Sequence, residues 1–180
     1  LDKYKPEEHN MFFATTKGKT KYTDIDYSKM NEVFVLYGKE TGANTILKAA
    51  SEHSLKNVKA IISDGAYTSV YDILGYRLIK DYKVPKFPTV NLIKRKIRKQ
   101  IKIDIKEDYV ELVKHNDIPT LYIHMKDDDF VPLKMVYPLY NANRGSKALF
   151  VLKEERYLYD LKETDEFKST LVNFITKYVK

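Results

Sequence analysis

The chain has 180 residues, with 32 Lys or Arg against 25 Asp or Glu, so its formal net charge at pH 7 is +7. That length suits one domain whose core needs no disulfide or metal staple. The sequence contains no cysteine, which excludes a disulfide framework and a thiolate metal site. It contains no apolar run long enough to span a bilayer and no signal peptide, so the cytoplasm is the default compartment. Residue 1 is Leu rather than Met, as in a processed or trimmed product.

Residues 1–31 are polar, rich in Lys and Tyr, and weakly patterned. Residues 11–15 and 20–22 have strand character and flank Gly18, which predicts a short hairpin with the glycine at its turn. No internal repeat or low-complexity tract is visible, so residues 1–180 are expected to form a single domain.

The segment 37–43 combines two glycines with a change of secondary structure. It follows an apolar run that predicts a strand, and it opens a small-residue helix expected over residues 42–54. A strand, a sharp turn and a helix are the setting of the nucleophile elbow, G-x-S-x-G. Gly38 and Gly42 occupy the glycine positions, but Glu40 stands where the motif has serine. The segment is therefore either an ordinary turn or a hydrolase scaffold without its nucleophile.

A helix is predicted over residues 69–82, with Ser69 as its N-cap and Asp72 three positions later in the manner of a capping box. The stretch that follows differs in character. Residues 84–88 contain two prolines, which break regular structure before the next predicted helix begins.

An amphipathic helix with a basic face is predicted over residues 92–102, because Ile recurs every four residues at positions 93, 97 and 101. Such charges attract phosphates and anionic headgroups. Lys is abundant throughout the chain, so we expect only weak contact with anionic surfaces. The interleaved residues are Ile rather than aromatic, so no specific nucleic-acid site is expected. The residues that would make the anionic-surface contact are Lys94, Arg95, Lys96, Arg98 and Lys99.

Four ordered segments resemble the C-terminal half of bacterial α/β-hydrolases of the serine esterase and peptidase type. After the elbow, residues 58–74 are similar to that family's strand-six segment. Residues 118–132 are similar to its strand-seven segment, usually I-P-x-L-x-I-H-G-x-x-D-x-x-V-P. Residues 148–152 would be the last strand and residues 165–178 the closing helix. The resemblance implies an α/β fold, with a mostly parallel sheet flanked by helices, as a partial α/β-hydrolase core. It also implies that residues 83–117 form a lid-like insertion between strands six and seven.

The resemblance places the catalytic triad on residues that are mostly of the wrong type. The family's acid falls on Asp128 and its nucleophile on Glu40. Its histidine falls on Arg156 or Tyr157, because the alignment is ambiguous by one residue. Asp128 alone can neither attack nor activate a nucleophile. We expect Arg156 to bridge Glu40 and Asp128, so that ion pairs stabilise a site that has lost its chemistry.

Other polar residues near these positions have weaker functional readings. Lys39 and Thr41 flank the elbow and are candidate ligand-binding residues. His124 lies at the family's His-Gly position, where it is more often structural, and it is a further ligand-binding candidate. The run Asp127–Asp129 lacks the spacing of a calcium loop, so no metal site is predicted. No cofactor is implied.

The favoured interpretation is a catalytically inactive hydrolase homologue that acts by binding or assembly. The alternative is an esterase, lipase or peptidase with an atypical site, such as a Glu40 carboxylate nucleophile, or one completed by a missing N-terminal half. The family's elbow follows its fifth strand, so the earlier strands and half of the oxyanion hole are expected to have no counterpart here. The resulting open sheet edge would be covered by residues 1–31, by self-association, or by a second chain or N-terminal fragment.

Overall fold

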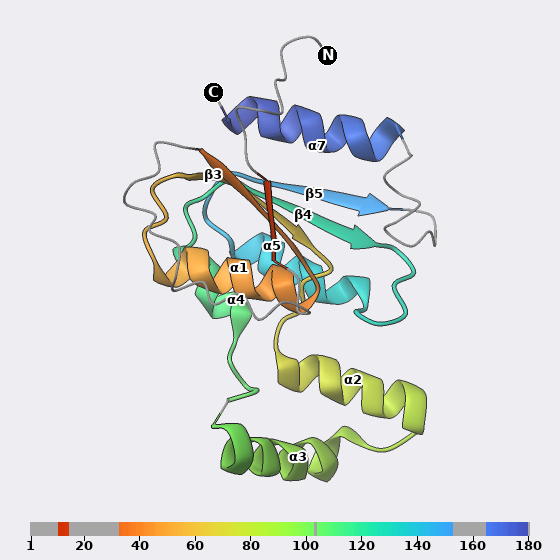
Figure 1. The fold of residues 1–180 in the computed structure, drawn as a ribbon. Coiled ribbons are helices and arrows are strands. Elements are labelled where there is room, and N and C mark those ends of the chain that lie inside the picture. Colours follow the sequence, from red (N-terminus) through yellow and green to blue (C-terminus); the bar gives the residue numbers. More distant parts are fainter. Residues whose placement is uncertain (1–10, 15–32, 103, 153–164, 180) are drawn as a thin grey trace.

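The computed structural model describes residues 11–14, 33–102, 104–152 and 165–179, of which 11–14 and 101 are described by their backbone alone (Figure 1). Its strands are β1 (Met11–Ala14), β2 (Phe34–Lys39), β3 (Val58–Asp64), β4 (Thr120–Met125) and β5 (Lys147–Leu152). Its helices are α1 (Thr41–Glu52), α2 (Val70–Tyr82), α3 (Lys86–Ile101), α4 (Tyr109–Leu112), α5 (Val136–Ala142) and α7 (Asp165–Tyr178). Short 3₁₀ turns lie at Val113–His115 and Leu133–Met135.

In the described ranges, five strands form one sheet in the order β1-β2-β3-β4-β5, and every neighbouring pair is parallel. The central strands β3 and β4 are almost entirely buried. Such strands are apolar on both faces because helices cover both faces of a parallel sheet. The predicted α/β architecture, a parallel sheet flanked by helices, is therefore confirmed.

Helices cover the two faces of the sheet unequally, with α1, α4 and α5 on one face and α7 on the other (Figure 1). Successive residues of β3 point to opposite faces. Ile61 thus packs with Leu47 and Tyr122 on the α1 side. Ile62 packs with Phe167 on the α7 side. Packing on both faces fixes the positions of the strands relative to one another. The elbow lies at the carboxyl end of β2.

Among the described residues, one strand precedes the elbow strand, contrary to the expectation that the earlier strands have no counterpart. β1 runs parallel to β2, with Met11 opposite Val35 and Ala14 opposite Gly38. Part of the N-terminal segment therefore covers this edge of β2. The second arm of the predicted hairpin lies outside the described residues.

The helices α2 and α3 lie side by side and project from the sheet at the end away from α7 (Figure 1). The Ser69 hydroxyl accepts a hydrogen bond of 3.0 Å from the Asp72 amide, which confirms the predicted N-cap. α3 begins before the predicted residue 92. Farther on, α4 and the turn at Val113–His115 return to the body and pack against α1.

Within the described ranges, no helix combines the length and the apolar character that a membrane crossing requires.

Candidate functional site

Glu40 sits at the apex of a sharp turn between β2 and α1. Its backbone has φ 51° and ψ −115°, a conformation that non-glycine residues rarely adopt and that costs of order 1–3 kcal/mol. The turn is fixed by its neighbours, since the Glu40 amide donates 2.7 Å to the Asp64 carbonyl and the Asn44 amide donates 3.2 Å to the Glu40 carbonyl. The strained geometry of an elbow is thus present, with a carboxylate in place of a hydroxyl.

Glycine is required at position 38 by the tightness of this turn. A Cβ atom on Gly38 would lie 2.8 Å from the Ala43 amide nitrogen and closer still to the Gly42 carbonyl oxygen. Backbone atoms cannot yield as a flexible side chain can, so any side chain at 38 would force the strand and helix apart. The glycine pattern read from the sequence therefore reflects a steric requirement of the elbow.

Asp128 is held by the loop that follows β4. Its Oδ1 atom accepts hydrogen bonds from the amides of Phe130 (2.7 Å) and Val131 (2.8 Å). The next residue, Asp129, is bound from α2, because Lys80 Nζ lies 2.5 Å from its Oδ1 and Arg77 Nη1 donates 3.0 Å to its carbonyl. The loop that carries Asp128 is therefore held both by its own backbone amides and by helix α2.

A third carboxyl at these strand ends, Asp64, was not predicted from the sequence. It ends β3 and is only 5% exposed, and the Tyr37 hydroxyl donates a 2.7 Å hydrogen bond to its Oδ2. Burial is the main cause that raises the pKa of Asp64 to about 6, and the Tyr37 hydrogen bond and the charge of Lys39 oppose it. The charges of Asp128 and Glu40 raise this pKa further. The three carboxyls therefore share one electrostatic environment, at the strand ends where ligands of open α/β sheets bind.

Two of the remaining predicted site residues lie at the elbow. Lys39 is exposed, and Thr41 is exposed with its Oγ1 accepting a 3.3 Å hydrogen bond from the Tyr67 hydroxyl. Arg156 and Tyr157 lie outside the described residues, so the predicted bridge between Glu40 and Asp128 remains a prediction. No group of acidic or histidine side chains in the described ranges has the arrangement of a metal site.

Comparison with known proteins places this geometry in a recognised architecture. No family model matches the sequence. The chain is 24% identical over 174 residues to the uncharacterized protein YqkD of Bacillus subtilis, covering 96% of this chain and 54% of YqkD. Its structure resembles the Pyrococcus furiosus esterase PF2001 with a TM-score of 0.60 at 18% identity, covering 86% of this chain and 57% of the esterase. It also resembles an alpha/beta fold family hydrolase from Bacillus anthracis with a TM-score of 0.55 at 15% identity, covering 79% of this chain and 67% of the hydrolase.

The chain has the α/β-hydrolase fold. It spans about half the length of YqkD and of the esterase. In hydrolases of this fold the nucleophile sits on the strand-to-helix elbow and needs a histidine base. The positions of the histidines therefore show whether a base is available to the residue at the elbow.

His124 is the described histidine on a strand that ends at the site, and its ring is fully buried. Its Nε2 lies 2.8 Å from the Val131 carbonyl, so Nε2 carries the proton and donates. Burial lowers the pKa of this imidazole, which keeps it neutral at neutral pH. The ring anchors the start of the loop after Asp128, which supports a structural role; ligand binding by His124 remains a prediction.

The other described histidines lie far from the elbow. His53 caps the far end of α1, which is 12 residues long and therefore about 18 Å from end to end. His115 precedes β4 and so lies near the amino ends of the parallel strands, whereas Glu40 lies at their carboxyl ends. Both are exposed. His9 lies outside the described residues. No described histidine is thus hydrogen-bonded to Glu40.

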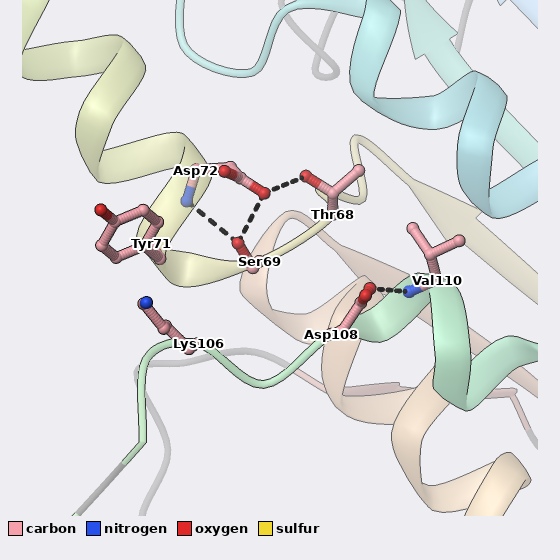
Figure 2. Close-up of a pocket in the computed structure, with 7 residues that line it drawn as sticks. All are labelled: Thr68, Ser69, Tyr71, Asp72, Lys106, Asp108 and Val110. Atoms are coloured by element: carbon pink, nitrogen blue, oxygen red, sulfur yellow. Dashed lines mark hydrogen bonds between the residues drawn. The ribbon is translucent and has the colours of Figure 1, made fainter. Parts of the chain in front are cut away.

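A cavity of about 450 Å³ opens between the start of α2 and the start of α4 (Figure 2). One of its two carboxylates, Asp72, is already engaged, because Thr68 and Ser69 donate hydroxyl hydrogen bonds to it and Lys86 lies 2.9 Å from it. Neither Glu40 nor Asp128 reaches this cavity, so it is separate from the elbow. The residues that line it are Thr68, Ser69, Tyr71, Asp72, Lys106, Asp108 and Val110.

Proposed function

We propose that this chain is a catalytically inactive homologue of the α/β-hydrolases that acts by binding or assembly. The observation that carries the proposal is Glu40 at the apex of an intact elbow, with φ 51°. A serine hydrolase needs a hydroxyl at that point and a histidine within hydrogen-bond reach of it. The chain offers a carboxylate there, and no described histidine forms a hydrogen bond with it.

The other carboxyls of the rim support a structural role for the former site. Asp128 spends Oδ1 on two backbone amides, and Asp64 is bonded by Tyr37. A triad acid must also orient an imidazole, and no described histidine is hydrogen-bonded to Asp128. The exposed residues Lys39 and Thr41 beside the elbow are the groups we propose for contact with a ligand.

Assembly through the sheet is the second part of the proposal. β1 is the outer strand of the described sheet next to the elbow strand, and an outer strand presents backbone groups on which another chain can pair. We expect light scattering to show association that increases with concentration. A monomer at every concentration would leave ligand binding as the remaining mode.

One observation favours a hydrolase with an atypical site as a second candidate. A carboxyl with a pKa of about 6 is poised to exchange protons near neutral pH, and Asp64 lies next to the carboxylate of Glu40. Pairs of carboxyls with separated pKa values are used as acid and base or as nucleophile in other enzymes. This version of the site would act on ester or amide bonds through Glu40.

A pair of activity measurements separates the two candidates. We expect no labelling by a fluorophosphonate probe and no turnover of short-chain nitrophenyl esters. Any turnover is to be measured again in Glu40→Gln and in Glu52→Gln, which removes an exposed carboxylate at the far end of α1. If Glu40→Gln abolishes turnover and Glu52→Gln preserves it, the protein is a hydrolase that acts through Glu40 and the proposal of an inactive homologue is wrong.

A further inference from the structure

The positive charge of this protein is concentrated in one segment. Residues 83–102 contain eight Lys or Arg and no Asp or Glu, whereas the rest of the chain holds the other 24 basic residues and all 25 acidic ones. The net charge of +7 therefore resides in this segment, and the remainder is close to neutral. Lysine is abundant elsewhere too, but there acidic residues balance it.

The basic groups of this segment face solvent on the outer side of α3. Leu92 is 62% exposed, and Arg95, Lys96 and Lys99 follow it at three-, four- and seven-residue spacing, which places all four on one face of the helix. Val90 is fully buried on the opposite face. With described partners, only Lys86 and Lys94 of the segment form ion pairs, so the outer stripe is free to meet an external anion.

Apolar side chains are exposed in the same part of the molecule. Seven large hydrophobic residues of the described ranges are exposed, and four of them belong to α2 and α3: Ile79 (51%), Tyr82 (72%), Phe87 (73%) and Leu92 (62%). Figure 1 shows these two helices projecting beyond the body of the fold. The projection thus combines positive charge without described ion-pair partners and apolar side chains that are each more than half exposed.

We propose that the projection formed by α2 and α3 docks reversibly on an anionic lipid bilayer. Basic residues near such a surface are attracted to its headgroups, and exposed Leu and aromatic side chains enter the boundary between headgroups and acyl chains. This combination favours a bilayer over a nucleic acid. A phosphate backbone offers no apolar contact for Leu92, and the outer stripe of α3 carries no aromatic residue for stacking on bases. The docking does not depend on whether the Glu40 site is inert.

The first arm of the test measures the electrostatic part with the full 180-residue chain. Co-sedimentation with phosphatidylcholine vesicles that contain phosphatidylserine is compared with pure phosphatidylcholine vesicles. The triple variant Arg95→Glu, Lys96→Glu, Lys99→Glu should bind the anionic vesicles about a hundredfold more weakly, since each basic contact contributes about fivefold. The triple variant Lys134→Glu, Arg144→Glu, Lys168→Glu changes the net charge equally at exposed sites elsewhere and should bind nearly as well as the parent. Equal losses in the two variants would overturn a localised docking surface.

The second arm tests whether apolar residues enter the bilayer. The chain has no tryptophan, so Leu92→Trp introduces a single reporter, and Tyr137→Trp places one at a site on α5 that is 43% exposed. Anionic vesicles should shift the emission of the first variant to the blue and leave the second unchanged. Binding without a shift at position 92, or tighter binding to single-stranded RNA that the vesicles cannot displace, would overturn the bilayer as the partner. Circular dichroism of every variant verifies that it is folded.

Discussion

The hydroxyl of Tyr37 donates a 2.7 Å hydrogen bond to Oδ2 of Asp64, joining the adjacent strands β2 and β3 on the face of the sheet that α7 covers. This bond partly compensates the burial of a carboxyl that is only 5% exposed. Burial nevertheless prevails, and the pKa of Asp64 rises from 3.8 to about 6. A carboxyl with a raised pKa therefore lies at the elbow, and the stability of the fold depends on pH through this residue.

Asp64→Asn should stabilise the protein at neutral pH. Because the folded-state pKa is raised, the native state keeps a proton that the unfolded chain releases, so Asp64 lowers stability as pH rises from about 4 to about 6. The full effect, reached above pH 6, is about 3 kcal/mol for the shift from 3.8 to about 6. Asn carries no charge and retains an acceptor for Tyr37. Urea unfolding should show a gain near pH 7 that disappears below about pH 4. A variant no more stable at pH 7 than at pH 4, relative to the parent, would contradict this account.

Tyr37→Phe should destabilise the protein in a pH-dependent way. Loss of the donor raises the pKa of Asp64 further, because the Tyr37 hydrogen bond lowers it. A hydrogen bond to a charged group contributes about 2 kcal/mol, so the loss should be larger above pH 6 than below pH 5. Tyr122→Phe is a matched control, since the Tyr122 hydroxyl accepts a 2.9 Å hydrogen bond from the neutral amide of Asn143 and its loss should not vary with pH. Equal pH profiles for the two variants would show that the Tyr37 hydroxyl does not act through Asp64.

Asp128 should behave as a loop residue rather than a catalytic one. Asp128→Ala removes the acceptor of two backbone amides and should cost about 1–2 kcal/mol. Asp128→Asn keeps an oxygen in the same place and should cost less than half as much. The exposed neighbour Asp127 serves as a control, because Asp127→Ala should change stability by no more than about 0.5 kcal/mol. Thermal or urea unfolding decides between these values, and equal costs for the Ala and Asn variants would contradict the amide-acceptor role.

The features that the sequence predicted well are local ones. The glycines of the elbow and the N-cap at Ser69 depend on residues within four positions of each other, so their spacing is visible in a single chain. Asp64 and Tyr37 are 27 positions apart, and their contact follows from the register of β2 against β3, which no local pattern specifies. A carboxyl as the last residue of a buried strand was the one available signal.

The start of α3 and the pairing of β1 show the same limit. The recurrence of Ile every four residues placed the start of the basic helix at residue 92, but the described helix begins at Lys86, and Phe87 within it is non-helical, with φ −103° and ψ 135°. The side chain of Lys86 packs over Gly75 of α2, so a tertiary contact fixes where the chain turns. The strand β1 is likewise defined by its pairing with β2. The polar residues around β1 in the sequence give no indication of that pairing.

Glu40→Gly should stabilise the protein, because glycine adopts positive φ without a Cβ clash. Relief of the strain at φ 51° and ψ −115° is worth about 1–3 kcal/mol, and the greater flexibility of glycine in the unfolded chain offsets up to about 1 kcal/mol of it. A net gain of about 1 kcal/mol in the free energy of unfolding is expected.

Two further variants separate strain from charge in this prediction. Glu40→Ala also removes the carboxylate beside Asp64 and Asp128 but keeps the strained backbone, so Glu40→Gly should exceed it in stability. Ala49→Gly in the interior of α1 should instead lose about 1 kcal/mol, as glycine does in an ordinary helix. If Glu40→Ala and Glu40→Gly had the same free energy of unfolding, the destabilisation would come from the carboxylate of Glu40 and not from backbone strain at the elbow.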